Sequence, residues 1–208
     1  MWYKHFFTQK LNDCLVNMKI QFKTKIMTNL KIHNIENAPE DSKIFLENSQ
    51  KAFGMIPGLH GVLAGAPKTL EAYQTLHQLF TESSFNKEEL TVVWQAINVE
   101  HACHYCVPAH TGIAKMMKVD DAITEALRNE TVLENTKLEA LRTMTLAIVR
   151  NRGQVSQENL TAFYSAGYEE RQILEIILGI SQKVISNYTN HIANTPVDAP
   201  FQAFAWKK

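Results

Sequence analysis

The sequence predicts an all-α fold organised as one helical domain. From residue 37 onward, apolar residues recur three and four positions apart, which is the spacing of a helix face. Proline, glycine and capping residues separate these runs. No stretch alternates like a half-buried strand, and no βαβ pattern is present. At 208 residues the chain is long enough to bury a proper hydrophobic core.

The start and end of each expected helix follow from local signals. Pro39 with two following acidic residues favours a helix N-terminus, and Gly54 ends that helix before a turn at 55–59. Two more helices are marked by apolar spacing and caps: one after Pro67 with Leu70, Tyr73, Leu76 and Phe80, and one that begins at the Asn86–Glu89 capping box and continues with Leu90, Val93 and Ile97. Beyond the cysteines, one helix is expected to reach about Lys118 and another to run from Asp120 to about Asn129. The last three are a helix with Leu138, Leu141, Met144 and Ile148 that ends at Gly153, a short one from Ser156 to Gly167, and a long one from Glu169 to about Ala193. The last helix is apolar on most sides, which indicates burial. The aromatic tail from Phe201 to Trp206 is expected to dock on its own core or on a neighbouring subunit.

Composition argues against several classes of function. The chain carries 21 basic and 21 acidic residues, so a polyanionic partner such as nucleic acid is not indicated. No apolar run approaches the roughly 18 residues that suggest a membrane span. Three cysteines, two of them clustered, do not resemble a secreted disulfide framework and fit a cytosolic redox or metal pair. A cytoplasmic protein is therefore expected.

Residues 1–36 are predicted to be a basic N-terminal extension, followed by the helical domain at 37–208. Five lysines against Asp13 give the first 26 residues a charge of +4, so residues 27–208 carry −4. Scattered apolar residues without a small-residue cleavage site argue against a signal peptide. We expect an arm without a catalytic role, in which Cys14 is an incidental thiol. A basic amphipathic helix, or an extension upstream of a start at Met27, is the alternative.

The candidate chemistry is concentrated in Glu100-His-Ala-Cys-His-Tyr-Cys-Val-Pro-Ala-His110. On a helix, the spacing of Cys103, Cys106 and His110 places the three side chains on one face. Because Pro108 is tolerated only in a first turn, the cysteines are expected at or just before a helix N-terminus. The helix dipole favours an anion there, which lowers the pKa of a thiol. His110 is placed to take up or return a proton.

Three uses of this pair remain open from the residues alone. A redox dithiol is favoured, because a Cys-x-x-Cys pair closes to a disulfide without large movement. A zinc site would use Cys103, Cys106 and His110 with His101 or His104 as fourth ligand, although no second ligand pair is visible. In the third interpretation, the two cysteines are small buried residues that only pack in a helical core. A thioredoxin-like site needs a preceding strand, which the sequence lacks.

The neighbouring polar residues also have two interpretations each. One helical turn would bring Glu100 near His104 or His110 in a proton relay, but a surface glutamate is equally expected. Tyr105 is placed to donate a hydrogen bond to a bound peroxide or thiolate, or simply to pack as an aromatic. Three further histidines are given no catalytic role: His60, His77 and His191.

The stretch from Val99 to Thr111, followed by Gly112-Ile-Ala, resembles the carboxymuconolactone decarboxylase / AhpD-like alkylhydroperoxidase family, and in particular a peroxidase-related bacterial branch. The resemblance extends from about residue 37 to Trp206. It implies an AhpD-like helical domain that assembles as homodimers, trimers or hexamers. It also implies a redox cycle that uses no bound cofactor or metal.

The resemblance implies roles for the cysteines. Cys106 attacks a small hydroperoxide as a thiolate, with His110 in the proton relay, and Cys103 resolves the sulfenic acid to a disulfide. An external dithiol, thioredoxin-like or lipoyl, then reduces the disulfide. Thiol–disulfide exchange alone would favour Cys103, expected to be the more exposed cysteine, as attacker of a disulfide partner. The expected site residues are Cys103, Cys106, His110, Glu100, His104 and Tyr105.

Two positions depart from the family's pattern. Many members carry a relay glutamate twelve residues before the first cysteine, where this chain has Thr91, so Glu100, Glu88 or Glu89 would have to substitute. The family's peroxidase prototype has histidine directly before the second cysteine, where this chain has Tyr105. A cytoplasmic, oligomeric, thiol-dependent oxidoreductase is expected. The alternatives are a helical oligomer that holds zinc and a lactone decarboxylase-like enzyme, although that reaction needs no dithiol.

Overall fold

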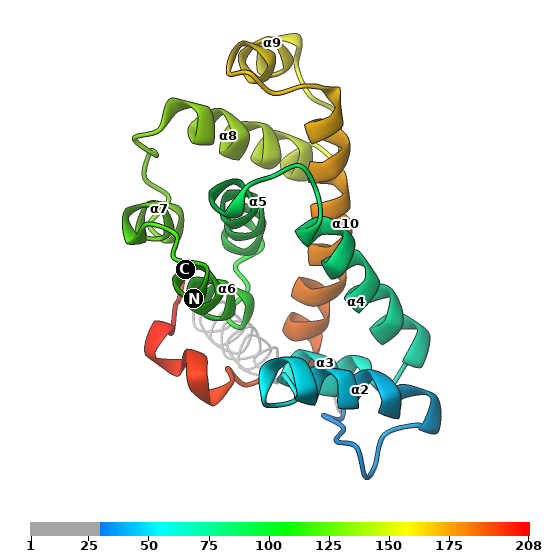
Figure 1. Cartoon of the computed structure of the whole chain (residues 1–208). Coiled ribbons are helices and arrows are strands. Elements are labelled where there is room, and N and C mark those ends of the chain that lie inside the picture. Colours follow the sequence, from blue (N-terminus) through cyan, green and yellow to red (C-terminus); the bar gives the residue numbers. More distant parts are fainter. Residues whose placement is uncertain (1–29) are drawn as a thin grey trace, which may run out of the picture.

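The computed structural model describes residues 30–208, which form helices joined by short turns (Figure 1). The helices are α2 (Glu40–Phe53), α3 (Gly58–Leu63), α4 (Pro67–Thr81), α5 (Lys87–Glu100), α6 (Cys106–Met116), α7 (Asp121–Arg128), α8 (Thr136–Arg150), α9 (Gln157–Ser165), α10 (Glu170–Ala193) and the 3₁₀ helix η1 (Ala199–Phe204). No strand occurs between residues 30 and 208, so the all-α prediction is confirmed. Cys14 and most of the expected basic arm lie outside the described residues.

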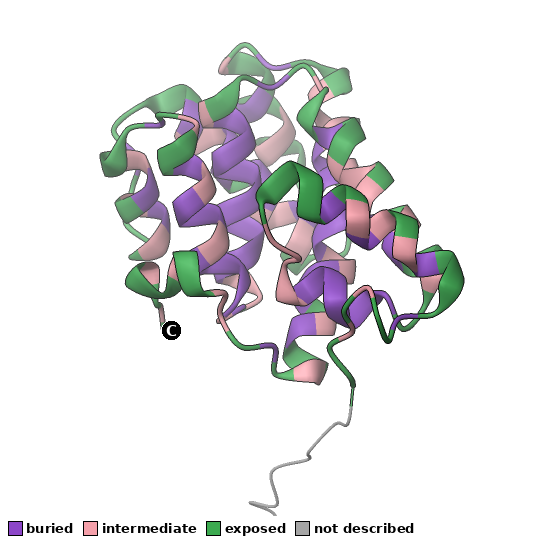
Figure 2. Ribbon diagram, turned by 60° about the horizontal axis from the view of Figure 1, so that its bottom comes forward, coloured by how far each residue is buried: buried purple, intermediate pink, exposed green. Residues whose placement is uncertain are grey.

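Helix α5 lies at the centre of the molecule. It packs against α6, α7, α8 and α10, and its residues 89–99 are all buried. The predicted capping box is present: Asn86 Oδ1 accepts the N–H of Glu89 at 3.0 Å, and Glu89 Oε2 accepts the N–H of Asn86 at 3.0 Å. Figure 2 shows buried residues gathered on the inner helices and exposed ones along the periphery. In the described chain, no helix has the length and apolar character that crossing a membrane requires.

The buried apolar residues form two clusters. The larger includes Phe80, Trp94 and Phe163 and fills the space around α5 and α8. The smaller lies around α2, α3 and α4, and both Cys103 and Cys106 belong to it. The cysteine pair is therefore part of the packed interior.

Helix α3 is a departure from the prediction, since a turn was expected at 55–59. The turn ends at Pro57, which supplies the N-cap, and Gly58 begins a helix. The chain before α2 crosses α3 closely: His33 N–H donates to Gly61 O at 2.9 Å. A Cβ on Gly61 would lie only 2.7 Å from His33 O, so this crossing requires glycine. Helix α6 also ends earlier than predicted, at Met116 rather than near Lys118.

The aromatic tail packs on its own chain, which is one of the two predicted arrangements; the other was a neighbouring subunit. Helix η1 packs against α6, where a Cβ on Gly112 would lie 2.5 Å from a ring carbon of Phe201. Arg128 Nη1 donates to Phe204 O at 3.1 Å, and Trp206 Nε1 donates to Arg128 O at 3.0 Å. The C-terminal segment thus becomes one wall of the candidate site.

Candidate active site

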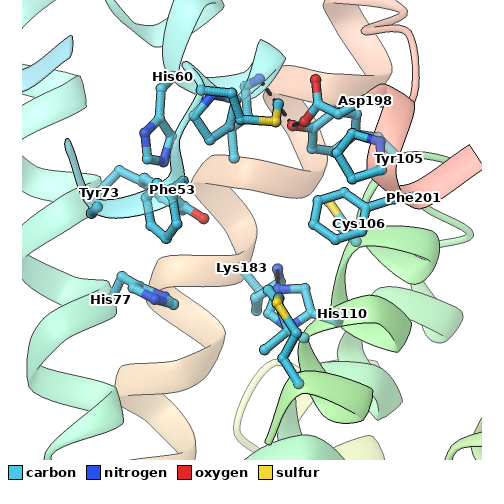
Figure 3. Close-up of a pocket in the computed structure, with 18 residues that line it drawn as sticks. Phe53, His60, Tyr73, His77, Tyr105, Cys106, His110, Lys183, Asp198 and Phe201 are labelled. Carbon is cyan, nitrogen blue, oxygen red and sulfur yellow. Dashed lines mark hydrogen bonds between the residues drawn. The ribbon is translucent and has the colours of Figure 1, made fainter. Parts of the chain in front are cut away.

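A cavity of about 330 Å³ lies between the end of α2, helices α3, α4, α6 and α10, and the C-terminal segment. Most of its wall is apolar, with Phe53, Leu59, Ile113 and Phe201 among the lining residues. Figure 3 shows His60, Tyr73 and His77 on one side of this space, with Cys106 and His110 on the other. Cys106 lines the cavity and Cys103 does not. A ligand in the cavity therefore meets the second cysteine of the pair.

Cys106 is the first residue of α6, which matches the prediction of a cysteine at a helix N-terminus. Asn190 Nδ2 donates to Cys106 Sγ at 3.3 Å. Burial opposes ionisation of this thiol. The hydrogen bond from Cys103, the charge of Lys183 and the amides of Asn190 and Asn187 outweigh burial and lower the pKa of Cys106 to about 6. Cys106 is therefore largely a thiolate at neutral pH.

Cys103 lies in the turn between α5 and α6, and its side chain holds its proton. The hydrogen bond to Cys106 raises the pKa of Cys103, and burial raises it further. Cys103 Sγ also accepts the N–H of Cys106 at 3.2 Å. Both cysteines are buried, so neither is the exposed thiol that disulfide exchange would favour; the difference that the structure shows is that Cys106 lines the cavity and Cys103 does not.

This difference between the thiols predicts selective alkylation. We expect iodoacetamide to modify Cys106 and to spare Cys103, because Cys106 alone of the two lines the cavity and has the lowered pKa. The rate should rise with pH to half its maximum at about pH 6 and level off above that. Peptide mapping by mass after timed alkylation at a series of pH values measures both quantities. A midpoint near 8.5, the ordinary pKa of a free cysteine, would contradict the assignment.

Lys183 and His110 form a buried pair beside Cys106. Lys183 Nζ lies 2.9 Å from His110 Nε2, and Lys183 is only 1% exposed. Burial lowers the pKa of Lys183, while the charge of the Cys106 thiolate opposes that shift. Burial, together with the charge of Lys183, lowers the pKa of His110 well below its usual value. His110 is therefore a neutral imidazole at neutral pH.

Two more histidines line the cavity as neutral rings. Burial lowers the pKa of His77 to about 4, with the charge of Lys183 adding to the effect. Gln182 Nε2 lies 3.2 Å from His77 Nδ1, while Gln182 Oε1 accepts the indole N–H of Trp94 at 2.9 Å. Burial likewise lowers the pKa of His60 to about 4, and His77 contributes. Among the described residues that line the cavity, Lys183 is the one lysine or arginine.

Tyr105 lines the cavity but its hydroxyl is already engaged. It donates to Asp198 Oδ2 at 2.5 Å and accepts the N–H of Leu59 at 3.3 Å. Asp198 also accepts the N–H of Gly58 at 3.0 Å, so one carboxylate joins the C-terminal segment to α3 and to the residue before Cys106. Burial and the neighbouring Asp198 raise the pKa of Tyr105.

Two of the expected site residues are placed elsewhere. Glu100 Oε2 pairs with Arg150 Nη2 at 2.7 Å, and this hydrogen bond, with the charge of Arg150, holds the pKa of Glu100 below its usual value. His104 Nε2 lies 3.0 Å from Thr195 O. Within residues 30–208, no hydrogen bond joins Glu100 to His104 or His110. The site therefore contains Cys103, Cys106 and His110, with Tyr105 at the wall.

Known structures share this architecture. No protein-family model and no curated protein sequence matches the chain. The AhpD-core, uncharacterized peroxidase-related protein from Ralstonia eutropha JMP134 superposes with a TM-score of 0.73 at 16% identity, over 84% of this chain and 94% of that one. The chain has an AhpD-like fold.

Two further structures support the same comparison. An uncharacterized peroxidase-related protein from Silicibacter sp. TM1040 gives a TM-score of 0.70 at 18% identity, over 86% of this chain and 96% of that one. The debrominase Bmp8, as a cysteine-to-alanine variant in complex with 2,3,4-tribromopyrrole, gives 0.70 at 16% identity, over 86% and 96%. The AhpD-like fold that the motif suggested is thus confirmed, and identities this low establish the fold alone.

In this AhpD-like fold, no carboxylate between residues 30 and 208 forms a hydrogen bond with His110, so Glu88, Glu89 and Glu100 do not contact it in this way. Thr91 is buried and its hydroxyl donates to Lys87 O at 2.8 Å. Glu89 completes the capping box and lies 3.5 Å from Lys137 Nζ. The described group that hydrogen-bonds His110 is Lys183, which the sequence analysis missed. The available signal was an ionisable residue inside the most apolar run of the sequence, 173–185.

The described residues of this AhpD-like fold do not form the zinc site that the sequence left open. Between residues 30 and 208, no group of three or more His, Cys, Asp or Glu side chains is arranged to hold a metal ion. His110 Nε2 faces Lys183 Nζ, a cation, so it is not offered to a metal. Of the two candidates for a fourth ligand, His101 has its Nδ1 2.9 Å from Asn187 Oδ1 and His104 has its Nε2 3.0 Å from Thr195 O.

Proposed function

We propose that this protein is a thiol-dependent oxidoreductase that reduces small hydroperoxides through Cys106 and Cys103. The observation that carries the proposal is the state of Cys106. Its pKa is lowered to about 6, it lines an apolar cavity of about 330 Å³, and a second thiol lies in hydrogen-bond contact. A reactive thiolate beside a protonated resolving thiol is what a two-cysteine peroxidase needs.

The reaction proceeds in two covalent steps. The Cys106 thiolate attacks the terminal oxygen of the hydroperoxide, forming an S–O bond as the O–O bond breaks, and the alkoxide leaves as an alcohol after taking a proton. The Cys103 thiol then attacks the sulfenic sulfur, forming the disulfide and releasing the hydroxyl as water with the thiol's proton. An external dithiol, thioredoxin-like or lipoyl, restores both thiols by disulfide exchange.

Thiol mapping tests the proposal directly. The protein is reduced, freed of reductant, given one equivalent of tert-butyl hydroperoxide, and then denatured, alkylated and analysed by mass. We expect Cys103 and Cys106 to become protected together within one disulfide peptide, while Cys14 remains alkylated as the internal control. Full alkylation of all three cysteines, with the hydroperoxide unconsumed, would refute the proposal.

Dehalogenation of an aromatic ring is a second candidate. The solved debrominase complex has the same fold, and the cavity here is walled by aromatic and aliphatic side chains. An aryl bromide and the dithiol would give the arene, the disulfide, bromide and a proton, which balances. Incubation of the reduced protein with 2,3,4-tribromopyrrole tests this candidate: bromide release matched by loss of the Cys103 and Cys106 thiols would support it, and bromide-free solution would exclude it for this substrate.

The wall formed by Phe201 should set the size of the substrate. Phe201→Ala is expected to raise kcat/KM for cumene hydroperoxide relative to tert-butyl hydroperoxide about tenfold, because removing the ring enlarges an apolar pocket. Steady-state assays with both substrates measure the ratio. Phe204→Ala is the matched control, since Phe204 also belongs to η1 and lies near Gly112 but does not line the cavity. Equal ratios in the two variants would contradict this role.

A further inference from the structure

Lys183 is a buried lysine without a carboxylate partner in residues 30–208. It is 1% exposed, and its Nζ contacts His110 Nε2 at 2.9 Å. The opposite charge that stabilises its ammonium form is that of the Cys106 thiolate. Burying a charge is costly unless it is paired, so a lysine at this buried position beside a thiol and an imidazole points to a role in the site.

We propose that Lys183 is the acid of the reaction: it pairs with the Cys106 thiolate in the resting protein and then supplies, through His110, the proton that the leaving alkoxide takes. This inference rests on the hydroperoxide reduction proposed above and adds the source of its proton. The expected relay glutamate is absent, so the proton needs another origin.

The hydrogen bonding of His110 fits a relay. With Lys183 as the ammonium of the proposal, which has three donors and no acceptor, His110 Nε2 accepts from Lys183 and the ring proton lies on Nδ1. His110 Nδ1 is buried and has no hydrogen-bond partner among the described residues. His110 also lines the cavity, and the relay has a substrate oxygen accept from this buried Nδ1 once substrate occupies the site.

A relay through the imidazole keeps His110 neutral throughout. As Nδ1 gives its proton to the alkoxide, Nε2 takes one from Lys183, so no imidazolium has to form in a buried position. This agrees with the burial that lowers the pKa of His110 so strongly. Lysine, rather than histidine, is then the group whose charge changes.

Atoms and charges balance over the cycle. Thiolate, hydroperoxide and the Lys183 ammonium become sulfenic acid, alcohol and the Lys183 amine. Disulfide closure releases water by using the Cys103 proton, which leaves Lys183 as the amine. When an external dithiol reduces the disulfide, one of its protons goes to Cys103 and the other to Lys183, and Cys106 returns as the thiolate.

The titratable groups near Lys183 decide which ionisation the pH profile of Cys106 alkylation reports. They are Cys103, Cys106 and His110 around the start of α6, with His77 on α4. His77 and His110 have lowered pKa values, so both rings are neutral through the range in which Cys106 ionises. A pH midpoint at about 6 therefore belongs to the Cys106 thiol coupled to Lys183.

Lys183→Met and Lys183→Arg in the full chain test the inference. Methionine retains an unbranched chain but removes the charge and donors, whereas arginine retains the charge. We expect Lys183→Met to raise the midpoint of Cys106 alkylation by at least about one pH unit and Lys183→Arg to leave it near wild type. An unchanged midpoint in Lys183→Met would overturn the pairing with Cys106.

The proton donor role is tested with leaving groups that differ in their need for a proton. The assay is run at a pH above the midpoints of Cys106 alkylation in wild type and in Lys183→Met, so that Cys106 is a thiolate in both proteins. There, Lys183→Met should reduce tert-butyl hydroperoxide about 10- to 100-fold more slowly than wild type. Peracetic acid, which expels the stable acetate ion, should react within a few-fold of the wild-type rate, and so should iodoacetamide, which expels iodide. Equal losses with all three reagents would overturn the relay, since a merely disturbed site would slow every reaction.

The outcome for the wild-type protein separates the two proposals. A raised alkylation midpoint in Lys183→Met, with a wild-type protein that leaves hydroperoxides intact, would refute the peroxidase and the relay but keep the ion pair. A wild-type protein that reduces tert-butyl hydroperoxide, with Lys183→Met equally fast above both midpoints, would keep the peroxidase and refute the relay. Unchanged thermal unfolding of the variants verifies that each comparison is made on folded protein.

Discussion

Cys106→Ser is expected to reduce hydroperoxide turnover by about a thousandfold or more. The surroundings of Cys106 lower the pKa of its thiol to about 6, but a serine hydroxyl remains un-ionised at neutral pH in the same position. The neighbouring Cys103 cannot replace it, because its own pKa is raised and it does not line the cavity. An assay with a dithiol donor measures the loss, and turnover within tenfold of wild type would show that Cys106 is not the attacking group.

Cys103→Ser should separate the two covalent steps. A serine hydroxyl can still donate a hydrogen bond to Cys106, so the first step with one equivalent of hydroperoxide should proceed. The sulfenic acid then has no neighbouring thiol and should persist, to be trapped by dimedone as an adduct on Cys106. Wild-type protein should form the disulfide and give no adduct. Absence of the dimedone adduct on Cys106 of Cys103→Ser, with hydroperoxide added, would contradict the assigned order of attack.

The fold was predictable because its signals are local. The Asn86 capping box, the Gly54 helix end and the placement of Cys106 at the start of α6 each depend on residues within one turn. Local signals also explain an error. The proposed contact between Glu100 and His104 assumed a continuous helix, but α5 ends at Glu100 and Ala102 adopts a φ of 50°, so the helical spacing is broken there.

The remainder of the site was not predictable from spacing. Lys183 is 73 residues from His110 in sequence, Asn190 is 84 residues from Cys106, and Asp198 is 93 residues from Tyr105. Only the packing of α10 and the C-terminal segment against α6 brings them together. Helix α10 was predicted to be buried and is, but the face it buries carries polar side chains: Gln182, Lys183, Ser186, Asn187 and Asn190.

Phe80→Ala is expected to lower the free energy of unfolding by about 3–5 kcal/mol. Phe80 is 0% exposed, and its ring lies 5.2 Å from that of Trp94 and 6.0 Å from that of Phe85. Removing it loses those contacts and leaves a cavity between α4, α5 and α10. Urea unfolding followed by tryptophan fluorescence measures the change. Phe53→Ala is the matched control, since Phe53 is 56% exposed and the same truncation there should cost far less.

The effect of Gly179→Ala on the free energy of unfolding should depend on whether Phe80 is present. A Cβ on Gly179 would lie 2.8 Å from a ring carbon of Phe80, so the single Gly179→Ala variant should be destabilised because a buried ring has little room to move. In the Phe80→Ala background the added methyl enters the space left by the ring, and its cost should shrink or reverse. A double-mutant cycle measures this coupling. Additive effects would mean that α4 and α10 do not meet at these two residues.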